Sequence, residues 1–434
     1  MGKFSKFLLS FSIKEGFLKS VFLYMSFTAL AQVIPLLISP ILTRIYSPSA
    51  FGSMTLFVSV VSFFSVFANG KYALALSLPK DNTEGIKILQ LASLISIVFA
   101  SVVFIAFWTC WTFFPLWIGK LGITKIFFLI GPSILFYSLS EILSYWLNRK
   151  ELFKRSSSSQ VIRTGVNSFN SLGGQFVFGS ATLEVSQFLG HLSSTCYLLW
   201  QVKKLEGKKI FRMASYRELW HVAKKYSSFP KINMPHNFLD KLNTEGIVFL
   251  ISSFFTSGVL GIFGLYIRIV KMPISVIGAA FGQVLFQRCI KIKNDNGEMK
   301  PFIKSTFKKL GIIATIPFII MLISGPQLFA FVLGKDWWQA GRFAQITSPL
   351  ILLQFIASPL AFLPIAVDRQ KTSFQYNLVG NILQLIAYLV GSMYGDMFVA
   401  LTLSTIFGCI YYVLYLLWLW EIADYKRVRG HEST

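Results

Sequence analysis

The 434-residue chain contains little charge, and negative charge is the scarcer sign. Charged residues make up 14% of the total, and 18 Asp and Glu stand against 41 Lys and Arg. Soluble domains usually contain about 25% charged residues. This composition therefore excludes an ordinary soluble domain.

Cysteine and histidine are also scarce, with four residues of each kind. Cys110, Cys196, Cys289 and Cys409 lie far apart, in or beside apolar segments. Such spacing fits neither a disulfide framework nor a metal cluster, so packing roles are expected and no metal site is predicted.

Catalytic motifs are missing as well. The sequence has no HExxH and no GxSxG, and none of its Gly-Lys pairs is followed by Ser or Thr, as a P-loop requires. No ATPase or hydrolase is expected. No cleavable signal peptide is expected either, because the first apolar run is too long and no small-residue cleavage site closes it.

What the chain does have is long apolar segments, with 54% hydrophobic residues and 44 Phe. About twelve runs reach the ~20 residues that a helix needs to cross a bilayer. They lie near residues 20–43, 52–77, 86–114, 124–148, 160–179, 183–202, 233–255, 258–286, 303–324, 342–366, 374–393 and 397–420. The fold class predicted is an all-α integral membrane protein.

Lys and Arg concentrate at the two termini and in every second gap between these runs. The remaining gaps hold only Arg44, Lys120, Lys125, Lys335 and Arg342. By the positive-inside rule, both termini and the central loop are expected on the cytoplasmic side. The net charge of +23 is then explained by topology and by anionic lipid headgroups, and no nucleic-acid partner is expected.

The chain divides near its middle. We expect an N-terminal six-helix bundle over 1–205, a basic amphipathic linker over 206–229 and a C-terminal six-helix bundle over 230–434. In the linker, Tyr216, Leu219, Trp220, Ala223 and Tyr226 recur at helical spacing. A helix on the cytoplasmic leaflet and a solvated linker helix both fit this pattern.

The halves also show a weak internal similarity. Residues 49–63 can be laid over 258–272 without gaps, which places Gly52 on Gly261 and Leu56 on Leu265. Six crossings per half would make this a parallel repeat, and transporters of that kind place their substrate path between the halves.

Polar residues mark the helix faces that see water, because they are costly in lipid. The run 258–286 carries one face with glycines at both ends and two cations, Arg268 and Lys271, in the middle. A cationic cavity is the favoured interpretation. Close packing through the glycines, with the cations paired to neighbours, is the alternative.

The run 233–255 has acids in its first turns. Asp240, Asn243, Thr244 and Glu245 predict a site for coupling to Na⁺ or H⁺, whereas an internal Lys241–Glu245 pair is an equal alternative. Further cavity cations are assigned from position alone: Lys71 and Lys241. The polar lining predicted elsewhere consists of Gln32, Ser59, Ser62, Asn69, Glu141 and Asn167.

Several segments resemble one family. KYSSFP (225–230), Gly261, Tyr266, Arg268 and GAAFGQVLFQR (278–288) are similar to motifs of bacterial polysaccharide flippases. LTRIYSPSAFGSMTLF (42–57) and YALALSLP (72–79) are similar to their first-half motifs. The chain thus resembles the Wzx-type O-antigen flippases of the MOP superfamily, relatives of lipid II flippases and MATE exporters.

The resemblance implies two six-helix bundles around a central cavity with alternating access, and no enzymatic activity. It implies transfer of an undecaprenyl-pyrophosphate-linked oligosaccharide across the bacterial inner membrane, to the periplasmic leaflet. Arg268 and Lys271 match the family's cationic eighth helix. A polysaccharide polymerase and chain-length machinery are the protein partners it suggests.

Two alternatives stay open. A MATE-like exporter of cations would need acids in its cavity, and this chain has more intramembrane Lys and Arg. A membrane-embedded polymerase or ligase usually needs a large outward loop, and the longest here, about 325–341, is short.

Overall fold

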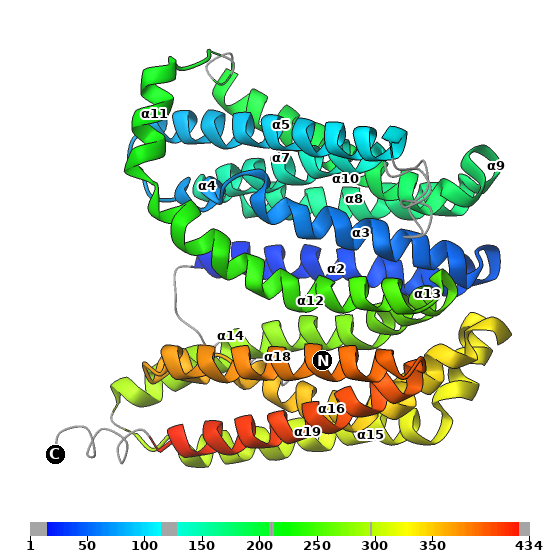
Figure 1. The fold of residues 1–434 in the computed structure, drawn as a ribbon. Helices are drawn as coiled ribbons and strands as arrows, with labels where there is room; N and C mark the ends of the chain where they lie inside the picture. The colour runs from blue at the N-terminus through cyan, green and yellow to red at the C-terminus, as the bar shows by residue number, and fades with distance from the viewer. Residues whose placement is uncertain (1–14, 114–127, 208–209, 211, 296, 425–434) are drawn as a thin grey trace. The chain divides into compact units, whose positions relative to one another are not determined.

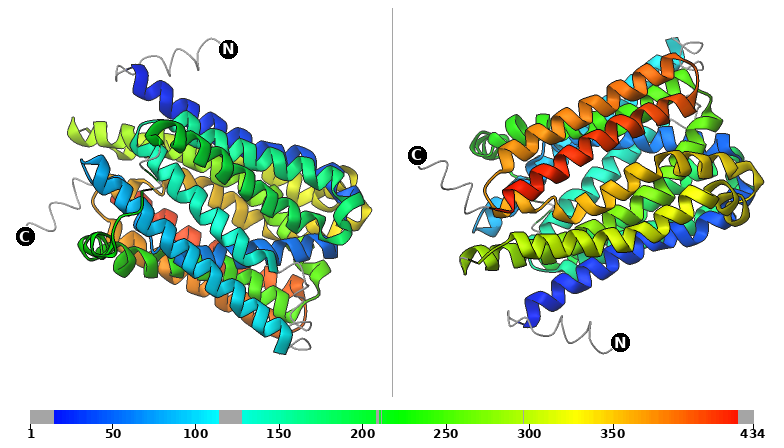
Figure 2. Two further views of the ribbon diagram at one scale, coloured as in Figure 1. Left: turned by 90° about the horizontal axis from the view of Figure 1, so that it is seen from above. Right: turned by 90° about the horizontal axis from the view of Figure 1, so that it is seen from below.

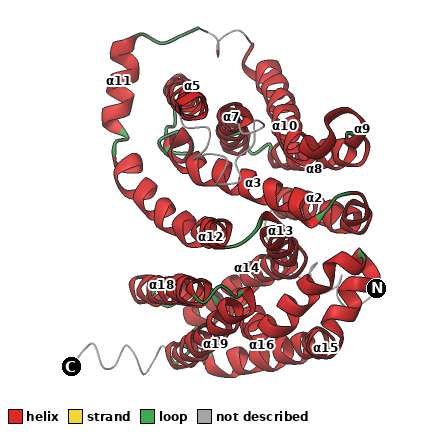
Figure 3. Cartoon of the chain, turned by 45° about the vertical axis from the view of Figure 1, so that its right-hand side comes forward, coloured by secondary structure: helices red, strands yellow, loops and turns green. Residues whose placement is uncertain are grey.

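In the computed structural model, all residues are described except 1–14, 114–127, 208–209, 211, 296 and 425–434. The described residues form helices and no strands (Figure 1, Figure 3). The long helices are α2 (Glu15–Ile45), α3 (Pro48–Ala68), α5 (Asn82–Phe113), α7 (Ile130–Arg149), α8 (Phe153–Gly173), α10 (Thr182–Glu206), α12 (Met234–Phe254), α14 (Met272–Asn294), α15 (Lys300–Leu333), α16 (Trp338–Leu360), α18 (Gln370–Met393) and α19 (Met397–Ile422). Shorter helices are α4 (Tyr72–Ala75), α9 (Gln175–Phe178), α11 (Tyr216–Lys225), α13 (Ser257–Tyr266) and α17 (Leu363–Ala366).

Each predicted apolar run overlaps a helix where it is described, and the all-α membrane fold is confirmed. The runs 52–77, 160–179 and 342–366 are too long as single helices, because each continues past the end of a long helix into a separate short one. Seven helices of the described chain, α2, α3, α5, α15, α16, α18 and α19, are long and apolar enough to span a bilayer. The predicted count of twelve crossings is not confirmed. The other predicted runs lie in α7, α8, α10, α12 and α13–α14, which carry the intramembrane polar residues.

Contacts group the described residues into two units. The first takes the described parts of Met1–Leu37, Val60–Gly119 and Ile123–Leu239. The second takes Ile38–Ser59 and the described part of Asp240–Thr434. The end of α2 and the start of α3 therefore group with the second half of the chain.

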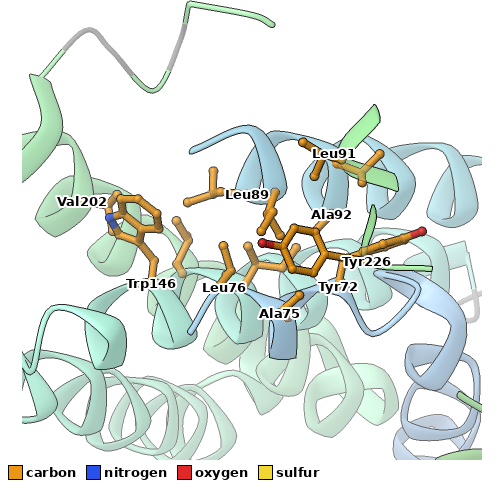
Figure 4. Packing of buried hydrophobic residues seen from close by; sticks show 14 of the residues in the cluster. Tyr72, Ala75, Leu76, Leu89, Leu91, Ala92, Trp146, Val202 and Tyr226 are labelled. Carbon is orange, nitrogen blue, oxygen red and sulfur yellow. The ribbon is translucent and has the colours of Figure 1, made fainter. Parts of the chain in front are cut away.

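The first unit has an apolar core at one end of its helices (Figure 4). Leu76, Ile88 and Trp146 are fully buried in it, together with Leu198 and Val202 from α10. α10 also packs on α8, and Figure 3 shows these two helices as neighbours.

The linker helix α11 runs across the end of this bundle and packs on α5 (Figure 1). It begins with a capping box between Ser215 and Glu218, which satisfies the free N–H groups of its first turn. Leu219 and Val222 are buried in the core just described, whereas Tyr216 and Trp220 are exposed and stack on each other. The linker is thus an amphipathic helix with a protein-facing side; its placement on the leaflet stays a prediction.

Side-chain contacts hold the linker in place. Gln90 of α5 donates to the carbonyls of Ile210 and Arg212 at 2.9 and 2.8 Å, and accepts from the N–H of Ala214. Lys87 pairs with Glu218 at 2.7 Å, and Lys225 pairs with Glu84.

In the second unit, α15 packs on α16 and α18 packs on α19; Figure 2 shows α18 and α19 side by side. The helix expected over 258–286 is not regular. A π-helical segment, η5 (Ile267–Lys271), separates α13 from α14. The prediction of one continuous helical face is therefore wrong at η5. A π-helical turn has one more residue between its hydrogen-bonded groups than an α-helical turn.

Candidate functional site

Arg268 and Lys271 both lie in η5. Pro273 lies two residues after Lys271 and has no N–H, so it cannot donate to the carbonyl of Ile269 as the α-helical pattern requires. Interruptions of this kind occur frequently at functional sites of helices. The local sequence thus accounts for a break in the helix where its two cations stand.

Both cations are partly buried, and neither forms a hydrogen bond or ion pair within the described chain. Among the described residues, no carboxylate forms an ion pair with either side chain. Unpaired buried charge is unfavourable unless a ligand or water supplies the counter-charge. The pair is therefore suited to bind an anion.

The glycines of the same run have a different role. A Cβ on Gly261 would meet the backbone of Pro48, and one on Gly264 would meet Thr55 of α3. Farther along, Gly278 faces Ser358 and Gly282 faces Phe362. The glycines thus permit close helix packing, while the cations between them stay unpaired.

A second polar group lies in the first unit, where α3 ends. Asn69 is fully buried and donates to Glu141 of α7 at 2.8 Å. The N–H of Lys71 donates to the Asn69 side chain at 2.9 Å. Gly70 and Lys71 both have left-handed backbones, with φ of 56° and 58°. Lys71 is 9% exposed. The structure thus brings three predicted site residues together.

His191 of α10 is a polar residue that the sequence analysis missed. It is buried beside Tyr137, with ring centroids 5.3 Å apart, and its Nδ1 has no hydrogen-bond partner in the described chain. Arg163 of α8 passes next to it, against Gly190. The stripe Glu184, Gln187, His191 and Ser194, at steps of three and four, could have pointed to this face.

The predicted ion-coupling residues occupy α12. Glu245 pairs with Lys241 at 3.2 Å, as the alternative proposed. The Thr244 hydroxyl donates to the Asp240 carbonyl of its own helix at 3.2 Å, and the Asn243 Oδ1 is buried without a partner in the described chain. Within the described residues no group of three His, Cys, Asp or Glu could hold a metal. Ion coupling here stays a prediction.

The remaining predicted lining is dispersed. Ser59 is buried, whereas Gln32 and Ser62 are half-buried. Asn167 accepts a hydrogen bond from Ser171 of its own helix at 3.1 Å. Asn69 and Glu141, by contrast, bond to each other directly.

The fold belongs to a known class of membrane transporters. The lipid II flippase MurJ, in an inward closed conformation, superposes with a TM-score of 0.68 at 18% identity, over 93% of this chain and 90% of MurJ. An inward-facing multidrug transporter of the MATE family and MOP superfamily gives 0.64 at 11% identity, covering 93% and 96%. The predicted MOP fold is therefore confirmed.

The family follows from sequence. Residues 41–342 match the family described as "Polysaccharide biosynthesis protein", and the chain belongs to that family.

Two curated relatives are each 24% identical to the chain. The teichuronic acid biosynthesis protein TuaB of Bacillus subtilis (strain 168) aligns over 52% of this chain and 48% of its own length. The lipopolysaccharide biosynthesis protein WzxC of Escherichia coli (strain K12) aligns over 43% and 37%. The matches thus span less than half of each relative.

Proposed function

We propose that this protein is a flippase for lipid-linked oligosaccharides. Its cargo would be an undecaprenyl-pyrophosphate-bound repeat unit, moved by alternating access from the cytoplasmic to the periplasmic leaflet of a bacterial inner membrane, with both termini cytoplasmic. The polysaccharide-biosynthesis family and the flippase fold support this class of function.

The observation that carries the proposal is the unpaired cation pair of η5. A pyrophosphate presents several anionic oxygens, and arginine can bind two of them at once while lysine acts as a point charge. Two cations three residues apart can therefore contact one pyrophosphate. No carboxylate of the described residues compensates these two partly buried cations, so the cargo headgroup would gain the interaction.

A sugar-pyrophosphate headgroup needs a protein to cross the bilayer. A sugar-pyrophosphate headgroup would lose its hydration in hydrocarbon, and unpaired charges and hydroxyls are costly there. A polar path lets the head cross while the polyprenyl tail stays in lipid. A membrane potential, negative inside, favours outward movement of an anion by about 2.3 kcal/mol per charge per 100 mV.

A cation exporter is less well supported. Such a protein needs acidic groups free to bind cargo, yet here Glu245 is paired with Lys241 and Glu141 accepts from Asn69. Coupling to Na⁺ or H⁺ at α12 would add a driving force. This coupling predicts that transport by the Asp240→Asn variant no longer depends on the Na⁺ or H⁺ gradient.

The test is neutralisation of both cations by Arg268→Gln with Lys271→Gln. We expect normal insertion, loss of surface polysaccharide and accumulation of lipid-linked units on the cytoplasmic side. The matched control is Arg288→Gln with Lys291→Gln, two exposed cations with the same spacing on α14. Normal surface polysaccharide in the first variant would remove the pair from the mechanism.

A further inference from the structure

Helix α8 of the first unit is unusually polar for a membrane protein. It covers most of the predicted run 160–179, yet it is not among the seven helices of the described chain that are apolar enough to span a bilayer. Its sequence contains four consecutive serines at 156–159 and amides at 160, 167 and 170. Because polar side chains are costly in lipid, each face of this helix needs a protein partner, water or a ligand.

One face of α8 is satisfied inside the protein. Ser157 and Thr164 are buried, and their hydroxyls donate to carbonyls four residues earlier in the same helix, at 3.0 and 2.8 Å. Ser186 of α10 is buried and bonds in the same way at 2.7 Å. α8 and α10 pack together (Figure 3), and small residues permit close contact between helices. Helix packing therefore accounts for the serines and threonines of this face.

A second set of polar residues on α8 is not explained by this packing. Gln160, Arg163 and Asn167, which we call the α8 row, follow one another at steps of three and four and are half-buried. Within the described chain, the side chains of Gln160 and Arg163 form no hydrogen bond. Asn167 accepts from Ser171 at 3.1 Å, and its amide nitrogen donates to none of the described residues. The α8 row therefore has donors and acceptors available to a ligand.

His191 of α10 borders the α8 row. It follows Gly190, where a Cβ would lie 2.9 Å from the Arg163 carbonyl oxygen and 3.3 Å from the Asn167 Cβ. His191 is 9% exposed, and its Nδ1 has no hydrogen-bond partner in the described chain. Buried polar atoms normally have a partner. A ligand bound at the α8 row would find this nitrogen in the same part of the first unit.

We infer that the α8 row, together with His191, binds the sugar part of the cargo. This rests on the proposed function, in which the transported lipid carries an oligosaccharide. A side-chain amide offers a donor and an acceptor side by side, and a guanidinium offers several donors, which suits the neighbouring hydroxyls of a sugar. Arg268 and Lys271, by contrast, have donors only and suit the pyrophosphate. The α8 row would thus make transport selective for the sugars.

Binding with and without the sugars tests this inference. Purified protein in lipid nanodiscs is titrated with undecaprenyl pyrophosphate, and separately with the lipid-linked oligosaccharide extracted from cells of the native host. We expect the parent to bind the oligosaccharide form about tenfold more tightly, because the sugar adds several hydrogen bonds. Gln160→Leu with Asn167→Leu should bind both lipids with the affinity that the parent has for undecaprenyl pyrophosphate.

The control is Gln375→Leu with Asn381→Leu, two amides of α18, which should keep the preference of the parent. An unchanged preference in Gln160→Leu with Asn167→Leu overturns the sugar site, and so does equal binding of the two lipids by the parent. Neither result contradicts a pyrophosphate site at η5. Failure of the proposed function is different, because the parent would then not bind undecaprenyl pyrophosphate at all.

A second variant separates sugar binding from packing. His191→Phe keeps an aromatic ring beside Tyr137 and removes both ring nitrogens. We expect affinity for the oligosaccharide form to fall several-fold, with an unchanged affinity for undecaprenyl pyrophosphate and an unchanged melting temperature. A lower melting temperature with the full preference for the oligosaccharide form would contradict a role of His191 in the sugar site.

Discussion

The hairpins α2–α3 and α12–α13 have equivalent turns, with their helix ends 209 residues apart. They also contact each other reciprocally, because a Cβ on Gly52 would meet Ser257 and a Cβ on Gly261 would meet Pro48.

The two hairpins differ one to two turns farther along. In the first half, α3 continues as a regular helix past Ser59 and Ser62. In the second half the equivalent positions, 209 residues later, are Arg268 and Lys271, and the helix becomes π-helical there. The repeat therefore supplies a common scaffold, and the cations belong to one copy only.

Two groups of predicted site residues, one in each half, also differ in how they are satisfied. Asn69 and Glu141 bond to each other inside the first unit. Arg268 and Lys271 have no such partner in the described chain. Buried groups that satisfy one another stabilise a structure, whereas unsatisfied ones are available to a ligand. This difference supports the proposal that Arg268 and Lys271, in the second half, bind the anionic headgroup.

The largest effect is expected from making the halves alike. Arg268→Ser with Lys271→Ser gives the second half the residues of the first, and should abolish surface polysaccharide because no buried cation pair remains. Adding Ser59→Arg and Ser62→Lys should not restore it, since α3 has no π-helical segment. Surface polysaccharide, normalised to protein in the membrane, is the measurement. Restoration would show that the two copies are interchangeable.

A smaller effect tests the reciprocal contact. Gly52→Ala and Gly261→Ala should each lower the melting temperature of the purified protein by similar amounts, because both force the same backbone clash. Overpacking of this kind costs about 1–3 kcal/mol. Gly311→Ala is the control, since a Cβ there meets nothing within 4 Å. Strongly unequal shifts in melting temperature for the two glycine variants would show that the two contacts are not equivalent.

The smallest effect concerns the linker. Lys87, and then the Ser215 N–H, lower the pKa of Glu218 to about 2 from an ordinary value near 4.5. A lowered pKa means that the ion pair stabilises the docked linker above about pH 4.5 and is lost as pH falls toward 2. Proteolysis in the linker should therefore be slightly faster for Glu218→Gln than for the parent at pH 7.

The difference between Glu218→Gln and the parent should vanish near pH 2, which a series of buffers can follow with an acid-active protease. Salt should reduce it as well, because the pair is exposed. Glu421→Gln, which removes the negative charge of another exposed glutamate, serves as the charge control. A difference that persists at low pH would assign the effect of Glu218 to its capping role alone.

Much of this fold follows from periodicity and charge. Apolar runs locate the helices because a span must be long and lipid-facing. The ungapped match of 49–63 to 258–272 predicts the equivalence of Gly52 and Gly261, although it gives no hint that the two glycines touch. That contact depends on how the hairpins pack, which a local pattern does not encode.

Other features lie beyond side-chain patterns. A π-helical segment changes the backbone hydrogen bonds of a helix, but no distinctive sequence pattern marks it. The sequence therefore predicts that the helical face through Arg268 continues without a break. The linker carries apolar residues on more than one side, and only packing decides that Leu219 faces protein while Trp220 does not. His191 was missed because a single histidine in a membrane helix is not distinctive without its neighbours Tyr137 and Arg163.

The central claim is that Arg268 and Lys271 bind a pyrophosphate headgroup, and direct binding tests it best. Undecaprenyl pyrophosphate is titrated into purified protein in lipid nanodiscs, and the parent is compared with the two double variants. The account predicts salt-sensitive binding to the parent and to Arg288→Gln with Lys291→Gln, and its loss in Arg268→Gln with Lys271→Gln. Equal affinity for all three proteins would contradict it.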